Sequence, residues 1–120
     1  LEFRRVLFRS KLKEKGLPWE LAKSFDGAGV LSPFVNADQF PDPTDIGIRL
    51  TINGEVRQDG NSRDMLNPIV PLIQHIAGHF SLQAGDVVLT GTPSGVGPLN
   101  SGDELLLELP GASRFETRVL

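Results

Sequence analysis

Cysteine is absent from this 120-residue sequence, which excludes disulfide bonds and thiolate metal ligands and favours a reducing compartment such as the cytoplasm. No apolar run approaches the roughly 20 residues that a membrane-spanning helix needs, and no secretory signal pattern opens the sequence. A basic excess is missing too, because 12 lysines and arginines face 15 aspartates and glutamates. The resulting charge of −3 argues against nucleic acid as the main partner. We therefore expect a cytoplasmic protein with neither a membrane nor a nucleic-acid partner.

The composition is that of one soluble globular domain, with 39% hydrophobic and 22% charged residues. Residues 1–10 differ from the rest, because three arginines and one glutamate give them a charge of +2 and leave −5 for the remainder. The only methionine is Met65, and the opening Leu-Glu-Phe is a tripeptide that cloning sites commonly encode. We interpret residues 1–10 as an adaptor or cloning-derived segment. The alternative is a native basic amphipathic arm that docks on a partner or a membrane surface.

The clearest local pattern is a β-hairpin. Apolar residues alternate with other residues between Ile46 and Ile52, as in a half-buried strand. Asn53-Gly54 follows, the dipeptide that most strongly favours a two-residue hairpin turn, so residues 55–58 should form the returning strand.

Two further strands are predicted at residues 104–109 and 114–120, on either side of a Pro110-Gly111 turn. Near the start, residues 11–15 read as the end of a helix closed by Gly16, and residues 30–35 as an edge strand or an extended connection.

One convincing helix interrupts this pattern. Asn67 is suited to the N-cap and Pro68 to the first helical position, and apolar residues then recur near a period of 3.6 up to His79 or Phe80. Strands outnumber helices and do not alternate with them, so the sequence predicts a mostly β protein of the α+β class.

The most informative segment is Gly85-Asp-Val-Val-Leu-Thr-Gly-Thr-Pro-Ser-Gly-Val-Gly97. Val87 to Leu89 should form a short buried strand that leads into two threonines and three glycines. Hydroxyls and bare backbone amides at the end of a strand are typical of a small-molecule site. The segment lacks the lysine of a P-loop and the G-x-G-x-x-G order of a dinucleotide fingerprint. The alternative is a wide surface turn with no ligand.

Other chemical groups carry weaker signals. Lys23 lies among apolar residues that would partly desolvate it, so it could stabilise an enolate or oxyanion, although an ordinary surface lysine is the simpler reading. His75 and His79 are four residues apart, but without H-E-x-x-H they read as solvent-facing rather than zinc-binding. Three aspartates in a proline-containing loop, at positions 38, 42 and 45, are expected to stabilise turns.

Several ordered motifs together resemble the fumarylacetoacetate hydrolase family, and within it the short acylpyruvase-type members. These motifs are Lys15-Gly-Leu-Pro-Trp19, Ala22-Lys-Ser-Phe25, Val56-Arg-Gln58, Gly85 to Pro98, and Ser101-Gly-Asp103. The resemblance covers essentially all of residues 11–120, which correspond to the C-terminal part of such a catalytic domain.

The resemblance implies a fold in which mixed β-sheets form a sandwich or roll, here truncated, and usually a homodimer. It also implies an enzyme that uses Mg²⁺ or Mn²⁺ to cleave acylpyruvate-type 1,3-dicarbonyl acids into pyruvate and a carboxylate. In this family the metal holds the substrate's 2-oxo acid end, and a lysine stabilises the pyruvate enolate. By position, Lys23 matches the active-site lysine, and Gly91 and Thr92 match the substrate-binding loop. The metal ligands and the histidine-containing lid of relatives lie upstream of this sequence's start.

Other functions remain open at this point. A 2-oxo acid hydratase, an oxaloacetate decarboxylase or a hydroxymuconate isomerase could share the scaffold, and a non-catalytic binding module could keep the fold without the chemistry. We expect the 120 residues alone to be inactive and poorly soluble, with exposed strand edges and apolar surface.

Overall fold

The computed structural model describes residues 12–24 and 26–120, so the interpretation of residues 1–10 lies outside the described residues. The chain divides into two compact units, the first ending at Pro33 and the second running from Phe34 to Leu120. In the first unit, residues 12–14 are helical and Gly16 follows with a φ of +62°, as expected for a residue that ends a helix. Helix α2 then spans Glu20–Lys23.

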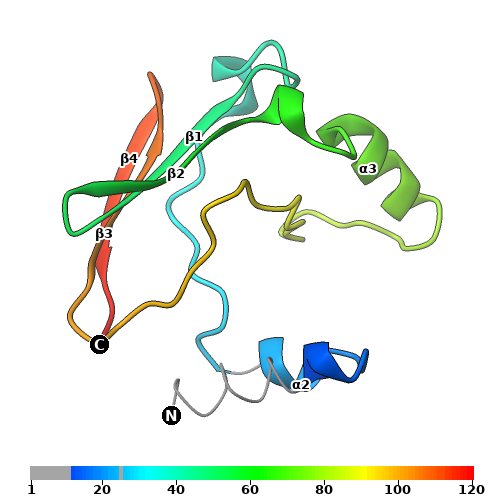
Figure 1. Cartoon of the computed structure of the whole chain (residues 1–120). Coiled ribbons are helices and arrows are strands. Elements are labelled where there is room, and N and C mark those ends of the chain that lie inside the picture. Colours follow the sequence, from blue (N-terminus) through cyan, green and yellow to red (C-terminus); the bar gives the residue numbers. More distant parts are fainter. Residues whose placement is uncertain (1–11, 25) are drawn as a thin grey trace. The chain divides into compact units, whose positions relative to one another are not determined.

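The second unit is built on a four-stranded sheet in the order β2-β1-β3-β4 (Figure 1). The strands are β1 (Gly47–Ile52), β2 (Glu55–Asn61), β3 (Glu104–Leu109) and β4 (Ser113–Arg118). All three ladders are antiparallel. The few helices are short: η1 (Ala37–Gln39), η2 (Ser62–Asp64) and α3 (Ile69–Ala77). The predicted mostly β class is confirmed.

The predicted hairpin is present between β1 and β2. Asn53 and Gly54 have φ values of +50° and +82°, the pair of positive angles that a type I′ turn needs. Strand β2 continues to Asn61 instead of ending at residue 58, because it stays paired with β1 as far as Gly47. A register irregularity between Leu50 and Thr51 bends this ladder.

The second hairpin, β3 and β4, also matches the sequence. Gly111 has a φ of +82° in the predicted turn, although β4 starts one residue earlier and ends two residues earlier than expected. Asn53 joins the two hairpins, because its side-chain Nδ2 donates to Asp103 Oδ1 at 2.9 Å and its Oδ1 accepts from the Glu104 backbone N–H at 2.9 Å.

The predictions for α3 were wrong at both ends. The N-cap is Pro68, not Asn67, and no side chain caps the helix. The helix ends at Ala77 with Gly78 as its C-cap, because the chain tightens there into a turn in which the His79 and Phe80 backbone N–H groups bond to the Ile76 carbonyl.

The predicted strand at Val87–Leu89 was also wrong. Residues 81–103 contain no helix or strand, and they run as a long connection from α3 to β3 (Figure 1). Leu89 is 82% exposed instead of buried. An apolar run forms a strand only where another strand satisfies its backbone groups, and no strand among the described residues pairs with this one.

Burial is limited in both units. The buried apolar side chains of the described residues are Ala22 and Ile52, and residues 30–35 are extended without forming a strand. Large exposed apolar side chains include those of Val70 on α3 and Phe80 after it, which confirms the expectation of exposed apolar surface. Across the part of the chain that is described, no helix has both the length and the hydropathy needed to span a bilayer.

Candidate functional site

The loop that carries Thr92 is held against strand β2 by one side chain. Gln58 Nε2 lies 2.9 Å from Thr92 Oγ1 and 2.8 Å from the Pro93 carbonyl oxygen. The Ser94 carbonyl oxygen is farther from the same nitrogen, at 3.4 Å. Gln58 lies on β2, the first strand of the sheet, so the loop is held against that edge strand.

Two glycines permit this close crossing. Gly95 has a φ of +97°, and a Cβ added to it would lie 1.9 Å from the Arg57 carbonyl oxygen, which no side chain could tolerate. On β2, a Cβ added to Gly60 would lie 2.7 Å from Cβ of Pro93. The close approach therefore requires glycine at position 95, and Gly60 is its counterpart on the sheet.

A cavity of about 820 Å³ lies beside this crossing. Its walls come from the start of β1 and the end of β2, from the start of α3, and from residues 89–94 of the loop, which include Gly91 and Thr92. Ile48, Ile69 and Leu72 contribute apolar surface, whereas Thr90 and Thr92 contribute hydroxyls. A cavity with a mostly apolar lining and a few polar groups is the usual form of a small-molecule site.

A polar network supports the rim of the cavity at Asn61 and Ser62. Asn61 Nδ2 donates to Asp45 Oδ1 at 2.8 Å, and Arg63 forms an ion pair with the same carboxylate. The hydrogen bonds from Asn61 and Arg63 lower the pKa of Asp45 below its usual value of 3.8. Ser62 Oγ donates to the Pro43 carbonyl oxygen at 2.9 Å and accepts from the Ile46 backbone N–H at 2.8 Å. These bonds fix the cavity rim to the preceding loop.

The aspartates behave largely as the sequence predicted. Asp42 Oδ1 accepts hydrogen bonds from the backbone N–H and the hydroxyl of Thr44, at 2.8 and 2.6 Å, and these bonds lower the pKa of Asp42. Asp38 lies within the short helix η1.

Lys23 is the last residue of α2, in the first unit. Its side chain is exposed, and Nζ lies 5.2 Å from the centre of the Trp19 ring, which is a cation–π distance. The partial desolvation expected from its apolar neighbours is therefore not seen. The catalytic role that the family resemblance gives to Lys23 stays a prediction, as do the binding roles of Gly91 and Thr92.

The two histidines are exposed and contact each other. Their ring centres are 4.8 Å apart, and His79 Nδ1 lies 2.9 Å from the His75 carbonyl oxygen. Within residues 12–24 and 26–120, no group of three or more histidine, cysteine, aspartate or glutamate side chains is arranged to hold a metal ion. The described residues therefore do not fit the Mg²⁺ or Mn²⁺ site that the resemblance implies.

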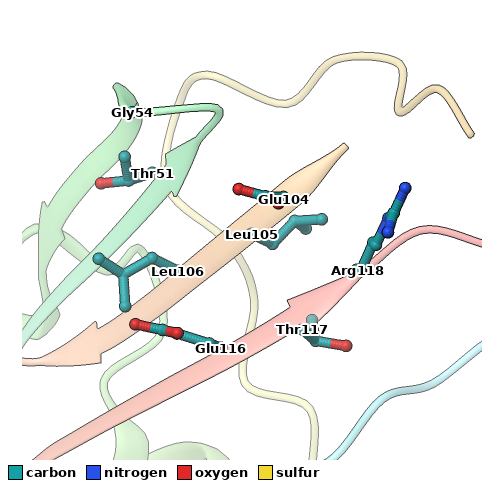
Figure 2. A pocket seen from close by; sticks show the side chains of 8 residues that line it. All are labelled: Thr51, Gly54, Glu104, Leu105, Leu106, Glu116, Thr117 and Arg118. Atoms are coloured by element: carbon teal, nitrogen blue, oxygen red, sulfur yellow. The ribbon is translucent and has the colours of Figure 1, made fainter. Parts of the chain in front are cut away.

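A second cavity of about 440 Å³ lies on strands β1, β3 and β4. Figure 2 shows Thr51, Leu106 and Glu116 side by side on these neighbouring strands, with Glu104 and Arg118 nearby. Glu116 accepts a hydrogen bond of 2.7 Å from Arg114 on its own strand. None of the site residues predicted from the sequence lines this cavity, so the cavity beside the Thr92 loop is the better candidate.

No role was predicted for Gln58, although its motif contributed to the family resemblance. The strand pattern carried no signal for it, because a regular two-residue turn at Asn53-Gly54 would place Gln58 opposite Arg49. Only the irregularity between Leu50 and Thr51 brings Gln58 opposite Leu50.

Fold and site together define a protein with a glycine-containing loop laid across an antiparallel sheet beside a cavity of ligand size. A family model described as fumarylacetoacetate (FAA) hydrolase C-terminal matches residues 4–120. The oxaloacetate tautomerase YcgM of Escherichia coli is 52% identical over 113 residues, which are 93% of this chain and 51% of that protein. The human mitochondrial oxaloacetate tautomerase FAHD1 is 42% identical over 97 residues, 81% of this chain and 44% of that protein.

Solved structures that resemble this chain point to the same family. A fumarylacetoacetate hydrolase family protein from Yersinia pestis matches with a TM-score of 0.85 and 49% identity, over 94% of this chain and 53% of that one. A fumarylpyruvate hydrolase from Pseudomonas aeruginosa, in complex with Mn²⁺ and pyruvate, matches with a TM-score of 0.83 and 31% identity, over 93% and 48% of the two chains. This chain belongs to the fumarylacetoacetate hydrolase family, as its motifs predicted. It spans about half the length of the curated relatives it matches.

Proposed function

We propose that the complete protein containing this chain is an enzyme that interconverts the keto and enol forms of oxaloacetate. The observation that carries this proposal is the 52% identity with an oxaloacetate tautomerase over almost the whole chain. The geometry supports it, because the Thr92 hydroxyl lines a cavity large enough for a small dicarboxylic acid. The reaction moves one proton from C3 of the substrate to the oxygen on C2, so that no other atom is gained or lost.

Within this proposal Thr92 binds a substrate oxygen, Gly91 lets the loop backbone approach the substrate, and Lys23 stabilises the negative charge that develops on the enolate oxygen. A lysine is suited to this task because its ammonium group is a compact charge on a long flexible side chain.

A second candidate is hydrolysis of acylpyruvate-type acids, which the sequence motifs favour. Two structural neighbours support it: the fumarylpyruvate hydrolase that contains pyruvate, and a maleylpyruvate hydrolase from Sphingobium with a TM-score of 0.68 and 32% identity. Both candidate reactions pass through the enol or enolate of a 2-oxo acid, so the same chemical groups of this chain would serve either one.

The proposal includes a requirement for Mg²⁺ or Mn²⁺, supported by the Mn²⁺ in the fumarylpyruvate hydrolase neighbour. The ligands would come from residues outside the described ranges, because the described ones hold no suitable group. A homodimer in the cytoplasm and a small 2-oxo acid as the partner molecule complete the proposal.

The test uses the complete protein with freshly dissolved enol-oxaloacetate, whose ketonisation is followed by the loss of enol absorbance. Acylpyruvates are assayed in parallel by release of pyruvate. We expect fast ketonisation that is lost on chelation and restored by Mg²⁺ or Mn²⁺. Cleavage of acylpyruvates without ketonisation of oxaloacetate would select the second candidate, and activity in neither assay would leave a non-catalytic module. The 120-residue chain alone should be inactive in both assays.

A further inference from the structure

The orientation of the Gln58 side chain is fixed by the groups around it. The Pro93 and Ser94 carbonyl oxygens can only accept hydrogen bonds, and they lie 2.8 and 3.4 Å from the terminal nitrogen. If the amide were turned around, its oxygen would face both carbonyl oxygens with no hydrogen between them. The NH₂ end of Gln58 must therefore point at the loop.

This orientation determines the role of the Thr92 hydroxyl. The nitrogen of a glutamine amide has no acceptor capacity, so Thr92 Oγ1 accepts from Gln58 across their 2.9 Å contact. A hydroxyl has one hydrogen and two lone pairs, and here one lone pair is occupied by Gln58. The hydroxyl hydrogen of Thr92 is consequently directed elsewhere, and Thr92 lines the cavity.

We propose that Gln58 is a positioning residue that orients the Thr92 hydroxyl as a hydrogen-bond donor toward an oxygen of the bound 2-oxo acid. Substrate carboxylate and carbonyl oxygens are acceptors, so a hydroxyl held in this way matches them and would bind a donor group poorly. This inference rests on the proposed function for the nature of the ligand, whereas the contacts of Gln58 stand independently of it.

The test is a double-mutant cycle in the complete protein, read out as kcat and KM for oxaloacetate and as the Kd for pyruvate measured by calorimetry in the presence of Mg²⁺. Gln58→Glu keeps the size of the side chain but replaces the donor by an acceptor that would capture the Thr92 hydrogen. Gln58→Met removes the donor without adding charge, in case the glutamate variant does not fold. Gln74→Glu, on the exposed face of α3, is the matched control for charge.

We expect Gln58→Glu to lower kcat/KM and pyruvate affinity about tenfold or more, the range for losing a hydrogen bond to a charged group. In the Thr92→Val background the same change should have a clearly smaller effect, because Gln58 then has no hydroxyl to orient and only its contacts with the Pro93 and Ser94 carbonyl oxygens are lost. Gln74→Glu should resemble the wild type.

Two results would overturn the inference: Gln58 variants that behave like the wild type, or effects of Gln58 and Thr92 substitutions that multiply in full. The second result would mean that Gln58 only anchors the loop through Pro93 and Ser94. If the wild type binds pyruvate and shows the expected cycle but converts no substrate, the proposed function fails and the inference stands. If it neither binds pyruvate nor turns over oxaloacetate, both fail.

Discussion

The side-chain amide of Asn53 donates a 2.9 Å hydrogen bond to the carboxylate of Asp103, 50 positions further along the chain. Asp103 also accepts from the Asn100 backbone N–H at 2.7 Å. These two bonds lower the pKa of Asp103 below its usual value of 3.8, and the bond from Asn100 has the larger effect. The junction between the two hairpins is therefore sensitive to acid.

A depressed carboxyl pKa in the folded state gives stability that is present above the unfolded pKa and is lost as the pH falls through the folded pKa. We expect the melting temperature to be level from pH 7 to about 5 and to fall below pH 4, since Asp42 and Asp45 shift in the same direction. Thermal melts between pH 7 and 2.5 check this. Asp103→Asn should lower the melting temperature at pH 7 and reduce the decrease in melting temperature between pH 5 and pH 2.5. The same substitution at exposed Asp38 reports the change in net charge alone. A larger decrease in melting temperature at low pH in the Asp103 variant than in the wild type would contradict the stabilising role of the Asp103 carboxylate.

Two substitutions of Thr92 should distinguish the contribution of its hydroxyl to activity from that of its methyl group. Thr92→Val keeps the shape and removes the hydroxyl, so we expect kcat/KM for oxaloacetate to fall by about one to two orders of magnitude. Thr92→Ser retains the hydroxyl and should stay within a few fold of the wild type. Steady-state kinetics on the complete protein give both values, with Thr117→Val on β4, which lines the second cavity and not the one beside Thr92, as a control. A valine variant that keeps the wild-type kcat/KM while the serine variant loses it would show that the methyl group, not the hydroxyl, matters.

Lys23 should matter for turnover more than for stability. Lys23→Ala in the complete protein is expected to lower kcat by ~10²–10³-fold, because an ammonium group that stabilises an enolate acts in the transition state. The loss of its contact with Trp19 should change the melting temperature little, since a cation–π pair at an exposed site contributes only about 0.5–1 kcal/mol. Lys15→Ala, at another exposed lysine of the first unit, is the control. An unchanged kcat would remove Lys23 from the mechanism.

The loop crossing should depend on Gly95 and not on Gly97. Gly95→Ala combines a strained positive φ, which costs roughly 1–2 kcal/mol, with a clash against the Arg57 carbonyl, so the loop should leave the sheet. At Gly97 an added Cβ meets nothing within 4 Å. Proteolytic cleavage within residues 91–97 should therefore be faster in the first variant and stay near wild type in the second. Equal cleavage rates in both variants would mean that the close approach at Gly95 is unimportant.

The parts of the fold that the sequence predicted are those decided by local chemistry. Asn53-Gly54 and Pro110-Gly111 encode turns through backbone angles, and the alternating or apolar runs beside them could be matched to strands. The run from Val87 to Leu89 has the same local character. A strand also requires a neighbouring strand to pair with, and the residues of the run do not determine whether one is present. The N-cap moved from Asn67 to Pro68 for a similar reason, since a good capping side chain is useful only if the backbone turns at that residue.

The loop with its glycines and Thr92 could be singled out from the sequence, because those residue types suit a close backbone approach and hydroxyl binding, and its binding role stays a prediction. Gln58 could not, because its importance comes from a contact with a residue 34 positions away. Such a contact depends on the register of β2 and on the path of an irregular loop, neither of which follows from composition or period.

The strand order β2-β1-β3-β4 sets the order of events during synthesis. The two hairpins close over short distances, on the microsecond scale of isolated hairpins, whereas the β1–β3 ladder must join segments about 50 residues apart. The loop that carries Thr92 lies inside the segment that this ladder closes. A nascent chain that has released this loop but not β3 and β4 therefore lacks the ladder that closes the segment, and we expect ligand binding to begin only after the last two strands have emerged.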